Sequence, residues 1–66
     1  MTVFINGEQK DFETEINLYQ LIQQLDITSN GLAIAINNSV VPKSNWEQTN
    51  LTDQDKITLI KATQGG

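Results

Sequence analysis

The amino-acid sequence predicts one α+β domain, in which a single main helix packs on one face of a mixed sheet of four or five strands. Three features support this: short β-branched segments near both ends, one helical apolar stripe between them, and asparagine-rich turns. A chain of 66 residues buries only about 60% of its unfolded surface, so its core is thin. We predict that residues 1–62 form the domain and that residues 63–66 form a flexible C-terminal diglycine tail.

The first predicted element is a β-hairpin. Thr2–Ile5 is β-branched and aromatic, and the Asn6-Gly7 pair follows at once. Asn-Gly between apolar stretches is the strongest short hairpin signal, because both residues accept the positive φ of a type I′ turn. We expect the return strand at about residues 9–13, with Phe12 as its apolar anchor. The alternative interpretation of the turn is a ligand-binding loop.

The main helix is predicted from four apolar residues at spacing i, i+3, i+4 and i+7. These residues are Leu18, Leu21, Ile22 and Leu25. Asn17 and Gln20 have the spacing of a capping box, and Ile16 stands where a hydrophobic staple to Leu21 would begin. The stripe could bind a partner helix, but a chain this short needs it for its own core.

Two further strands follow the helix. Leu32–Ile36 alternates large and small apolar residues, so its large side chains should pack under the helix and its alanines should lie nearer solvent or a partner. After a turn at residues 37–39, Val40-Val41 forms only a short strand, because Pro42 lacks the N–H that a sheet ladder requires. Trp46, in a segment predicted to be irregular, is either a binding hot spot or a core lid, and we favour the lid.

The last strand is predicted at residues 56–62, inside the sheet rather than at its edge, because both of its faces carry apolar residues. The preceding turn contains Asp53 and Asp55, two residues apart. A calcium loop needs several more oxygen ligands and a glycine at its sharp turn, so we predict no metal site here.

The composition excludes several kinds of chemistry. The chain has no Cys and no His, which removes disulfides, the usual zinc ligands, thiol nucleophiles and the imidazole base. We expect no bound cofactor, and a carrier or binding role rather than an enzyme. A net charge of −4 argues against nucleic-acid binding and favours a protein partner with a basic rim. Residues 1–5 are too short an apolar run for a signal peptide or membrane span. We expect a cytoplasmic protein without membrane association, monomeric when alone.

The C-terminal Gly65-Gly66 pair directly follows the end of the last strand region. Glycine lets another protein's backbone approach closely, which suits a terminus that is threaded into a partner's active site. The same pair also suits an ordinary frayed terminus. Because the chain offers no thiol and no imidazole, we expect any special reactivity to lie at the Gly66 carboxylate.

Short motifs span essentially the whole chain. They are Asn6-Gly7, Leu21-Ile22-x-x-Leu25, Ala35-Ile36-Asn37, Val41-Pro42 with Trp46, Asp53-x-Asp55-x-Ile57 and Gly65-Gly66. With the order of elements, this set resembles the ThiS family of sulfur carriers in thiamin biosynthesis, which has the ubiquitin-like β-grasp fold. One departure is Gln54, where the family pattern has an Asp-Gly-Asp turn. If that position needs a positive φ, Gln costs about 1 kcal/mol relative to Gly.

The resemblance implies that Gly66 is the site of covalent modification. A ThiF-like adenylyltransferase would use ATP and Mg²⁺ to adenylate its carboxylate. A persulfide derived from a cysteine desulfurase would then convert it to a thiocarboxylate, and a ThiG-like thiazole synthase would receive the sulfur. Gly65, Gln64 and Thr63 would thread into the partner, where a side chain at either glycine would obstruct a narrow channel.

The candidate docking surface for these partners is the sheet face that carries Ala33, Ala35 and Ile60. Three other interpretations stay open at this point. The chain could be the small subunit of a molybdopterin synthase, a ubiquitin-like protein modifier, or a plain interaction domain with an inert tail.

Overall fold

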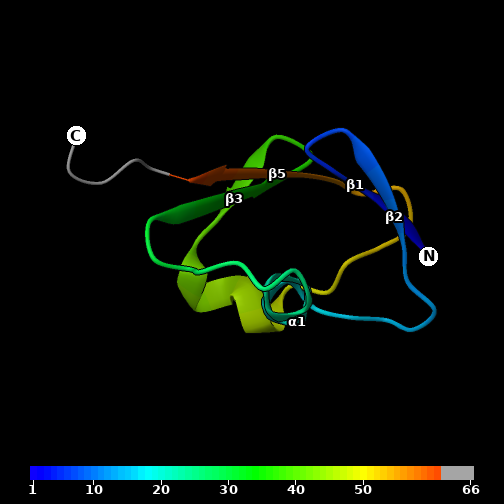
Figure 1. The fold of residues 1–66 in the computed structure, drawn as a ribbon, viewed down its shortest axis with the longest axis horizontal. Coiled ribbons are helices and arrows are strands. Elements are labelled where there is room, and N and C mark those ends of the chain that lie inside the picture. The colour runs from blue at the N-terminus through cyan, green and yellow to red at the C-terminus, as the bar shows by residue number, and fades with distance from the viewer. Residues whose placement is uncertain (62–66) are drawn as a thin grey trace.

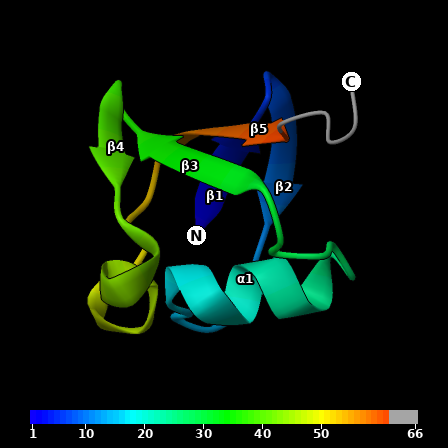
Figure 2. The same ribbon diagram turned by 90° about the vertical axis from the view of Figure 1, so that its left-hand side faces the viewer.

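The computed structural model describes residues 1–61 and contains a mixed five-stranded sheet with strand order β2-β1-β5-β3-β4. The helix α1 and the 3₁₀ helix η1 lie on the same side of the sheet (Figures 1 and 2). This confirms the predicted α+β class, with one main helix covering one face. In chain order the elements are β1 (Thr2–Ile5), β2 (Glu8–Asp11), α1 (Leu18–Gln24), β3 (Leu32–Ile36), β4 (Ser39–Val41), η1 (Lys43–Gln48) and β5 (Lys56–Lys61).

The predicted N-terminal hairpin is confirmed, with one correction to its second strand. Asn6 has φ 51° and Gly7 has φ 87°, the signs that a type I′ turn requires. The two-residue turn pairs Ile5 with Glu8 and Thr2 with Asp11, so β2 ends at Asp11 rather than at residue 13. Phe12 lies beyond the strand and packs, partly buried, against the core. It follows the last residue of β2 as an apolar anchor, and its backbone still pairs with Met1: Phe12 N donates to Met1 O at 2.8 Å, and the Met1 amino group donates to Phe12 O at 3.0 Å.

The helix begins and ends close to the prediction. Asn17 is its N-cap, and both hydrogen bonds of the capping box are present: Gln20 N donates to Asn17 Oδ1 at 2.8 Å, and Asn17 N donates to Gln20 Oε1 at 2.9 Å. Leu18, Leu21 and Ile22 are buried, as is Ile16, the other member of the expected staple. The apolar stripe therefore forms the core.

The segment around Trp46 is more regular than predicted. Residues Lys43–Gln48 form the 3₁₀ helix η1, which Pro42 precedes with φ −59°. Asn45 N donates to Pro42 O at 2.8 Å, the i to i+3 spacing of a 3₁₀ turn. Trp46 is only 2% exposed, and its Nε1 donates to Val41 O at 3.0 Å. Trp46 is thus a core lid, as favoured from the sequence.

The last strand, β5, occupies the centre of the sheet, as predicted. It runs parallel to β1, pairing Ile5 with Ile57, and antiparallel to β3, pairing Leu32 with Lys61. Its inward side chains complete a core shared by the sheet, α1 and η1. The buried apolar residues are Val3, Ile5, Ile16, Leu18, Leu21, Ile22, Ile34, Trp46, Leu51 and Ile57.

Gln54, which stands where the family pattern has glycine, has a φ of 74° and so adopts the left-handed conformation. An L side chain is strained there, whereas glycine is not. We expect Gln54→Gly to raise the free energy of unfolding by about 1 kcal/mol, measured by urea denaturation. Gln23→Gly is the control: the same change inside α1, at an exposed position, should lower stability by about 1 kcal/mol. If both changes shifted the free energy of unfolding by the same amount and in the same direction, the positive φ of Gln54 would not be the cause.

Candidate functional site

The predicted tail lies beyond the part of the chain that the structure describes. Thr63, Gln64, Gly65 and Gly66, as well as the expected strand end at residue 62, follow Lys61, the last described residue. Their roles therefore stay predictions. The structure does describe β5, the strand that leads to them. A neighbouring strand lies on each side of β5, with β1 on one side and β3 on the other.

The three predicted docking residues come together on one face. Ala33 of β3 lies directly opposite Ile60 of β5 in the sheet register. Ala35 lies two residues after Ala33 on β3. Side chains at alternate positions of a strand point to the same face. Ile60 is 58% exposed while Ile34, between the alanines, is buried in the core. Ala33, Ala35 and Ile60 therefore lie on the outer face, the sheet face opposite α1.

Sequence reasoning missed a fourth apolar residue on this face. Val40 of β4 is the register partner of Ala35 and is 74% exposed. Asn37 and Asn38 have φ 50° and 73°, so a two-residue type I′ turn joins β3 to β4. The Asn37-Asn38 pair is a sequence signal for such a turn. A two-residue turn at this position implies that residue 36 pairs with residue 39 and residue 35 with residue 40, which places Val40 beside Ala35. We call Ala33, Ala35, Val40 and Ile60 the outer apolar patch.

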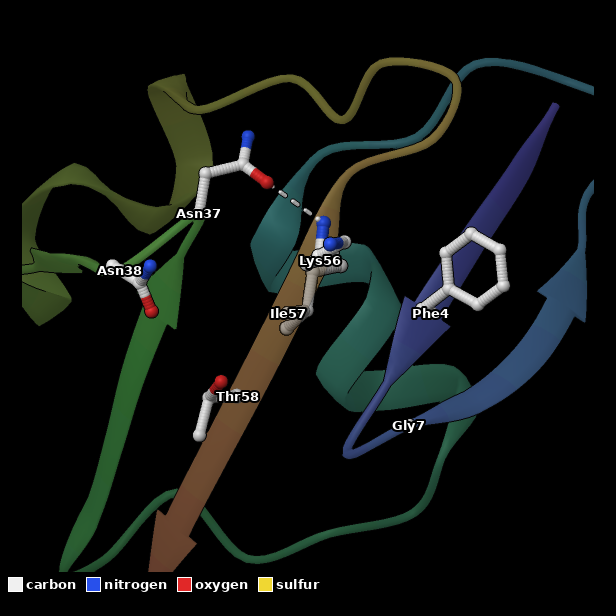
Figure 3. Close-up of a pocket in the computed structure, with 7 residues that line it drawn as sticks. All are labelled: Phe4, Gly7, Asn37, Asn38, Lys56, Ile57 and Thr58. Carbon is white, nitrogen blue, oxygen red and sulfur yellow. Dashed lines mark hydrogen bonds between the residues drawn. The ribbon is translucent and has the colours of Figure 1, made fainter.

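A hollow of about 320 Å³ lies beside the first residues of β5 (Figure 3). It is lined by Phe4, Gly7, Asn37, Asn38, Lys56, Ile57 and Thr58. Lys56 begins β5 and Lys61 ends it, so this hollow lies away from the exit of the tail. A second hollow, of about 430 Å³, lies at the tail end and is lined by Asn6, Asp26, Ile27, Thr28, Leu32, Leu59 and Lys61.

Two asparagine side chains bond directly to the backbone of β5. Asn37 Oδ1 accepts from Lys56 N at 3.0 Å, as Figure 3 shows, near the start of the strand. Asn6 Oδ1 accepts from Leu59 N at 2.8 Å, and Asn6 Nδ2 donates to Leu59 O at 3.4 Å, near its end. Each asparagine is the first residue of a type I′ turn. The hairpin turns that follow β1 and β3, the two neighbours of β5, therefore both bind the central strand through an asparagine side chain.

The two aspartates that raised the question of a cation site have structural partners instead. Asp55 is buried and accepts from Thr52 N at 2.8 Å, from Thr52 Oγ1 at 2.9 Å and from Asn37 Nδ2 at 3.1 Å. Within residues 1–61, no group of three or more acidic, Cys or His side chains gathers as a metal site. Asp55 thus fixes the turn before β5.

The carboxyl of Asp53, in the turn before β5, has a lowered pKa. Thr2 N donates to Asp53 Oδ1 at 2.6 Å, and this backbone hydrogen bond lowers the pKa of the exposed carboxyl below its ordinary value of 3.8. A carboxyl with a lowered pKa in the folded protein stabilises the fold above its unfolded pKa. That contribution is lost as the pH falls through the lowered pKa, so Asp53 tethers the N-terminal strand at neutral pH.

No helix in the described part of the chain has the length and apolar character to cross a membrane.

Comparison with known proteins identifies the family. The family model described as "ThiS family" matches residues 3–66. The protein named "Sulfur carrier protein ThiS" of Escherichia coli (strain K12) is 32% identical over 66 residues, covering 100% of both chains. A protein of Paramagnetospirillum magneticum named "Thiazole synthase" is 32% identical over 66 residues, which are 100% of this chain but only 20% of that protein.

A solved structure supports the fold. The crystal structure of the thiamine biosynthesis protein (ThiS) from Geobacter metallireducens superposes with a TM-score of 0.87, covering 100% of both chains at 19% identity. That identity is low enough that the likeness concerns the fold alone, the ubiquitin-like β-grasp. The family model and the end-to-end match at 32% identity go further. The chain belongs to the ThiS family.

Proposed function

We propose that this protein is a sulfur carrier of thiamin biosynthesis whose C-terminal Gly66 is activated by partner enzymes. The observation that carries the proposal is the extent of the family match, which runs from residue 3 through the terminal diglycine to residue 66. The E. coli relative that aligns over its full length is named a sulfur carrier. The protein itself is a co-substrate and not an enzyme.

The chemistry proceeds at the terminal carboxylate. A carboxylate is a poor electrophile, because its leaving group would be oxide. In the proposed sequence a carboxylate oxygen of Gly66 attacks the α-phosphorus of ATP, and pyrophosphate leaves. A persulfide sulfur, derived from a cysteine desulfurase, then attacks the acyl carbon and AMP leaves. A further thiol cleaves the resulting S–S bond, which leaves a thiocarboxylate on Gly66 and a disulfide on the donor side.

Two partner enzymes are required in this scheme. A ThiF-like adenylyltransferase binds the ATP and Mg²⁺, so the carrier needs no cofactor of its own. A ThiG-like thiazole synthase receives the sulfur, and the alignment of this whole chain with one fifth of a thiazole synthase supports that relation. The reaction takes place in the cytoplasm, where ATP and the activating enzyme meet.

The outer apolar patch is the proposed docking surface for these enzymes. Val40 and Ile60 are large, exposed and next to the two alanines, whereas the other large aliphatic side chains of the described residues are buried or partly buried. Apolar surface of this kind on a small domain marks a contact with another protein. Thr63, Gln64 and Gly65 would extend from the adjacent strand and carry Gly66 into the active site.

Intact mass spectrometry tests the proposal. After incubation with ATP, Mg²⁺, a ThiF-like enzyme and a sulfur source, we expect a product heavier by the exchange of one oxygen for one sulfur. The product should vanish when Gly66 is deleted. An unchanged mass, with an activating enzyme that is shown to modify another carrier, would reject the proposal. Transfer of the sulfur to a molybdopterin synthase subunit, and not to a thiazole synthase, would assign the carrier to the other pathway.

A further inference from the structure

The parallel pairing between β1 and β5 is short and stops before β5 does. It joins Phe4 with Lys56 and Ile5 with Ile57, and then β1 turns away at Asn6. Antiparallel pairing of β5 with β3 continues to Lys61. On the β1 side, the last residues of β5 therefore have no strand beside them, although they lead directly to the tail.

The Asn6 side chain occupies this place. The backbone N–H of Asn6 donates to Ile57 O at 2.9 Å, and this is the last backbone hydrogen bond between the β1 side and β5. One step further along β5, its amide contacts both backbone groups of one residue: Oδ1 accepts from Leu59 N at 2.8 Å and Nδ2 donates to Leu59 O at 3.4 Å. A primary amide carries the same donor and acceptor pair as a peptide group. The side chain thus continues the sheet pairing after the strand has ended.

We propose that Asn6 is a positioning residue for the C-terminal tail. By holding Leu59 against the β1–β2 turn, it sets the direction in which the chain leaves the sheet at Lys61. This inference rests on the proposed function, in which Gly66 must reach the active site of another protein. Order in the strand that carries the tail then lowers the entropy that is lost when the carboxylate is positioned there.

Asn37 provides a matched control within the same fold. It too is the first residue of a type I′ turn, with φ 50° against 51° for Asn6, and its Oδ1 also accepts from a β5 N–H. Its partner, Lys56, is at the opposite end of the strand from the tail. Loss of this side chain removes the bonds to Lys56 N and to Asp55, so it should also lower stability, but it leaves the contact with Leu59 intact.

The experiment compares Asn6→Gly with Asn37→Gly. Glycine keeps the positive φ of each turn and removes only the side-chain amide. Both changes should lower the urea midpoint. Asn6→Gly alone should accelerate hydrogen exchange of the Leu59 amide. With a ThiF-like enzyme, it should reduce kcat/KM for adenylation about tenfold, mainly through KM, because the lost order is restored on binding. Asn37→Gly should keep kcat/KM within about twofold of the unchanged protein.

Several outcomes would overturn the inference. Unchanged Leu59 exchange in Asn6→Gly would show that the amide does not hold the strand. Equal kcat/KM for the two variants would show that Asn6 acts only on stability. If Asn6→Gly is too unstable to assay, Asn6→Asp takes its place: it keeps the acceptor for Leu59 N–H but loses the donor, so intermediate exchange and kcat/KM are expected, and values equal to those of Asn6 would contradict the proposal. If the unchanged protein is not adenylated at all, the proposed function fails, while Leu59 exchange still tests whether Asn6 holds the strand.

Discussion

Gly65→Val is expected to abolish thiocarboxylate formation while leaving the domain folded. A β-branched side chain next to the reacting carboxylate would obstruct the approach of that carboxylate to the α-phosphate of ATP. Misplacement of reacting groups by about 1 Å can reduce a rate about 100-fold, so we expect at least that loss in kcat/KM. The described core lies entirely within residues 3–57, so the free energy of unfolding should change by less than about 0.5 kcal/mol.

The measurement is intact mass after incubation with the activating enzyme, with far-UV circular dichroism to confirm folding. Thr63→Val is the control, because it places the same valine side chain at a position that we expect only to extend the tail's reach. It should retain most of the activity. If Gly65→Val were converted as fast as the unchanged protein, the narrow-channel explanation of the diglycine would be wrong.

Trp46→Ala is expected to leave a large fraction of the protein unfolded at 25 °C. Trp46 is among the largest fully buried side chains, and its Nε1 satisfies the Val41 carbonyl from η1. Truncation of a buried Trp to Ala costs about 3–5 kcal/mol. A core of this size rarely supplies more than about 3–5 kcal/mol of net stability, so the loss is about equal to the whole.

Far-UV circular dichroism and the urea midpoint measure this effect without relying on the removed fluorophore. Val40→Ala is the matched control, because Val40 is three-quarters exposed and belongs to the outer apolar patch. Its unfolding free energy should stay within about 0.5 kcal/mol of the unchanged protein. If Trp46→Ala kept its midpoint, the lid would have to be dispensable, and the binding interpretation of Trp46 would return. Val40→Ala should instead weaken association with the activating enzyme.

Much of the fold was predictable because its signals are local. The Asn6-Gly7 turn, the capping box of Asn17 and Gln20 and the alternation in Leu32–Ile36 each depend on neighbours a few residues away. The central place of β5 also followed from the apolar residues on both of its faces. The family resemblance, carried by motifs along the whole chain, indicated the β-grasp fold, and the match over residues 3–66 confirmed the family.

The errors and omissions each have a physical cause. The end of β2 was misplaced because the two-residue turn and the short β1 together limit the ladder to four pairs, which the apolar character of Phe12 obscured. The 3₁₀ helix was missed because its polar residues show no apolar period, and its single buried residue, Trp46, is held by Val41 and the core. Val40 was missed because its position depends on the register of β4.

The sequence by itself determined that this is a small α+β domain that resembles the ThiS family and has no residues for thiol or imidazole chemistry. That Gly66 is its reactive group stays a prediction. Only the tertiary structure decided that Ala33 and Ile60 lie side by side, and that Asn6 holds Leu59, 53 residues further along the chain. Local propensities record how a residue prefers its immediate neighbours. A hydrogen bond across such a separation exists only once the order and register of the strands have brought two distant backbones together.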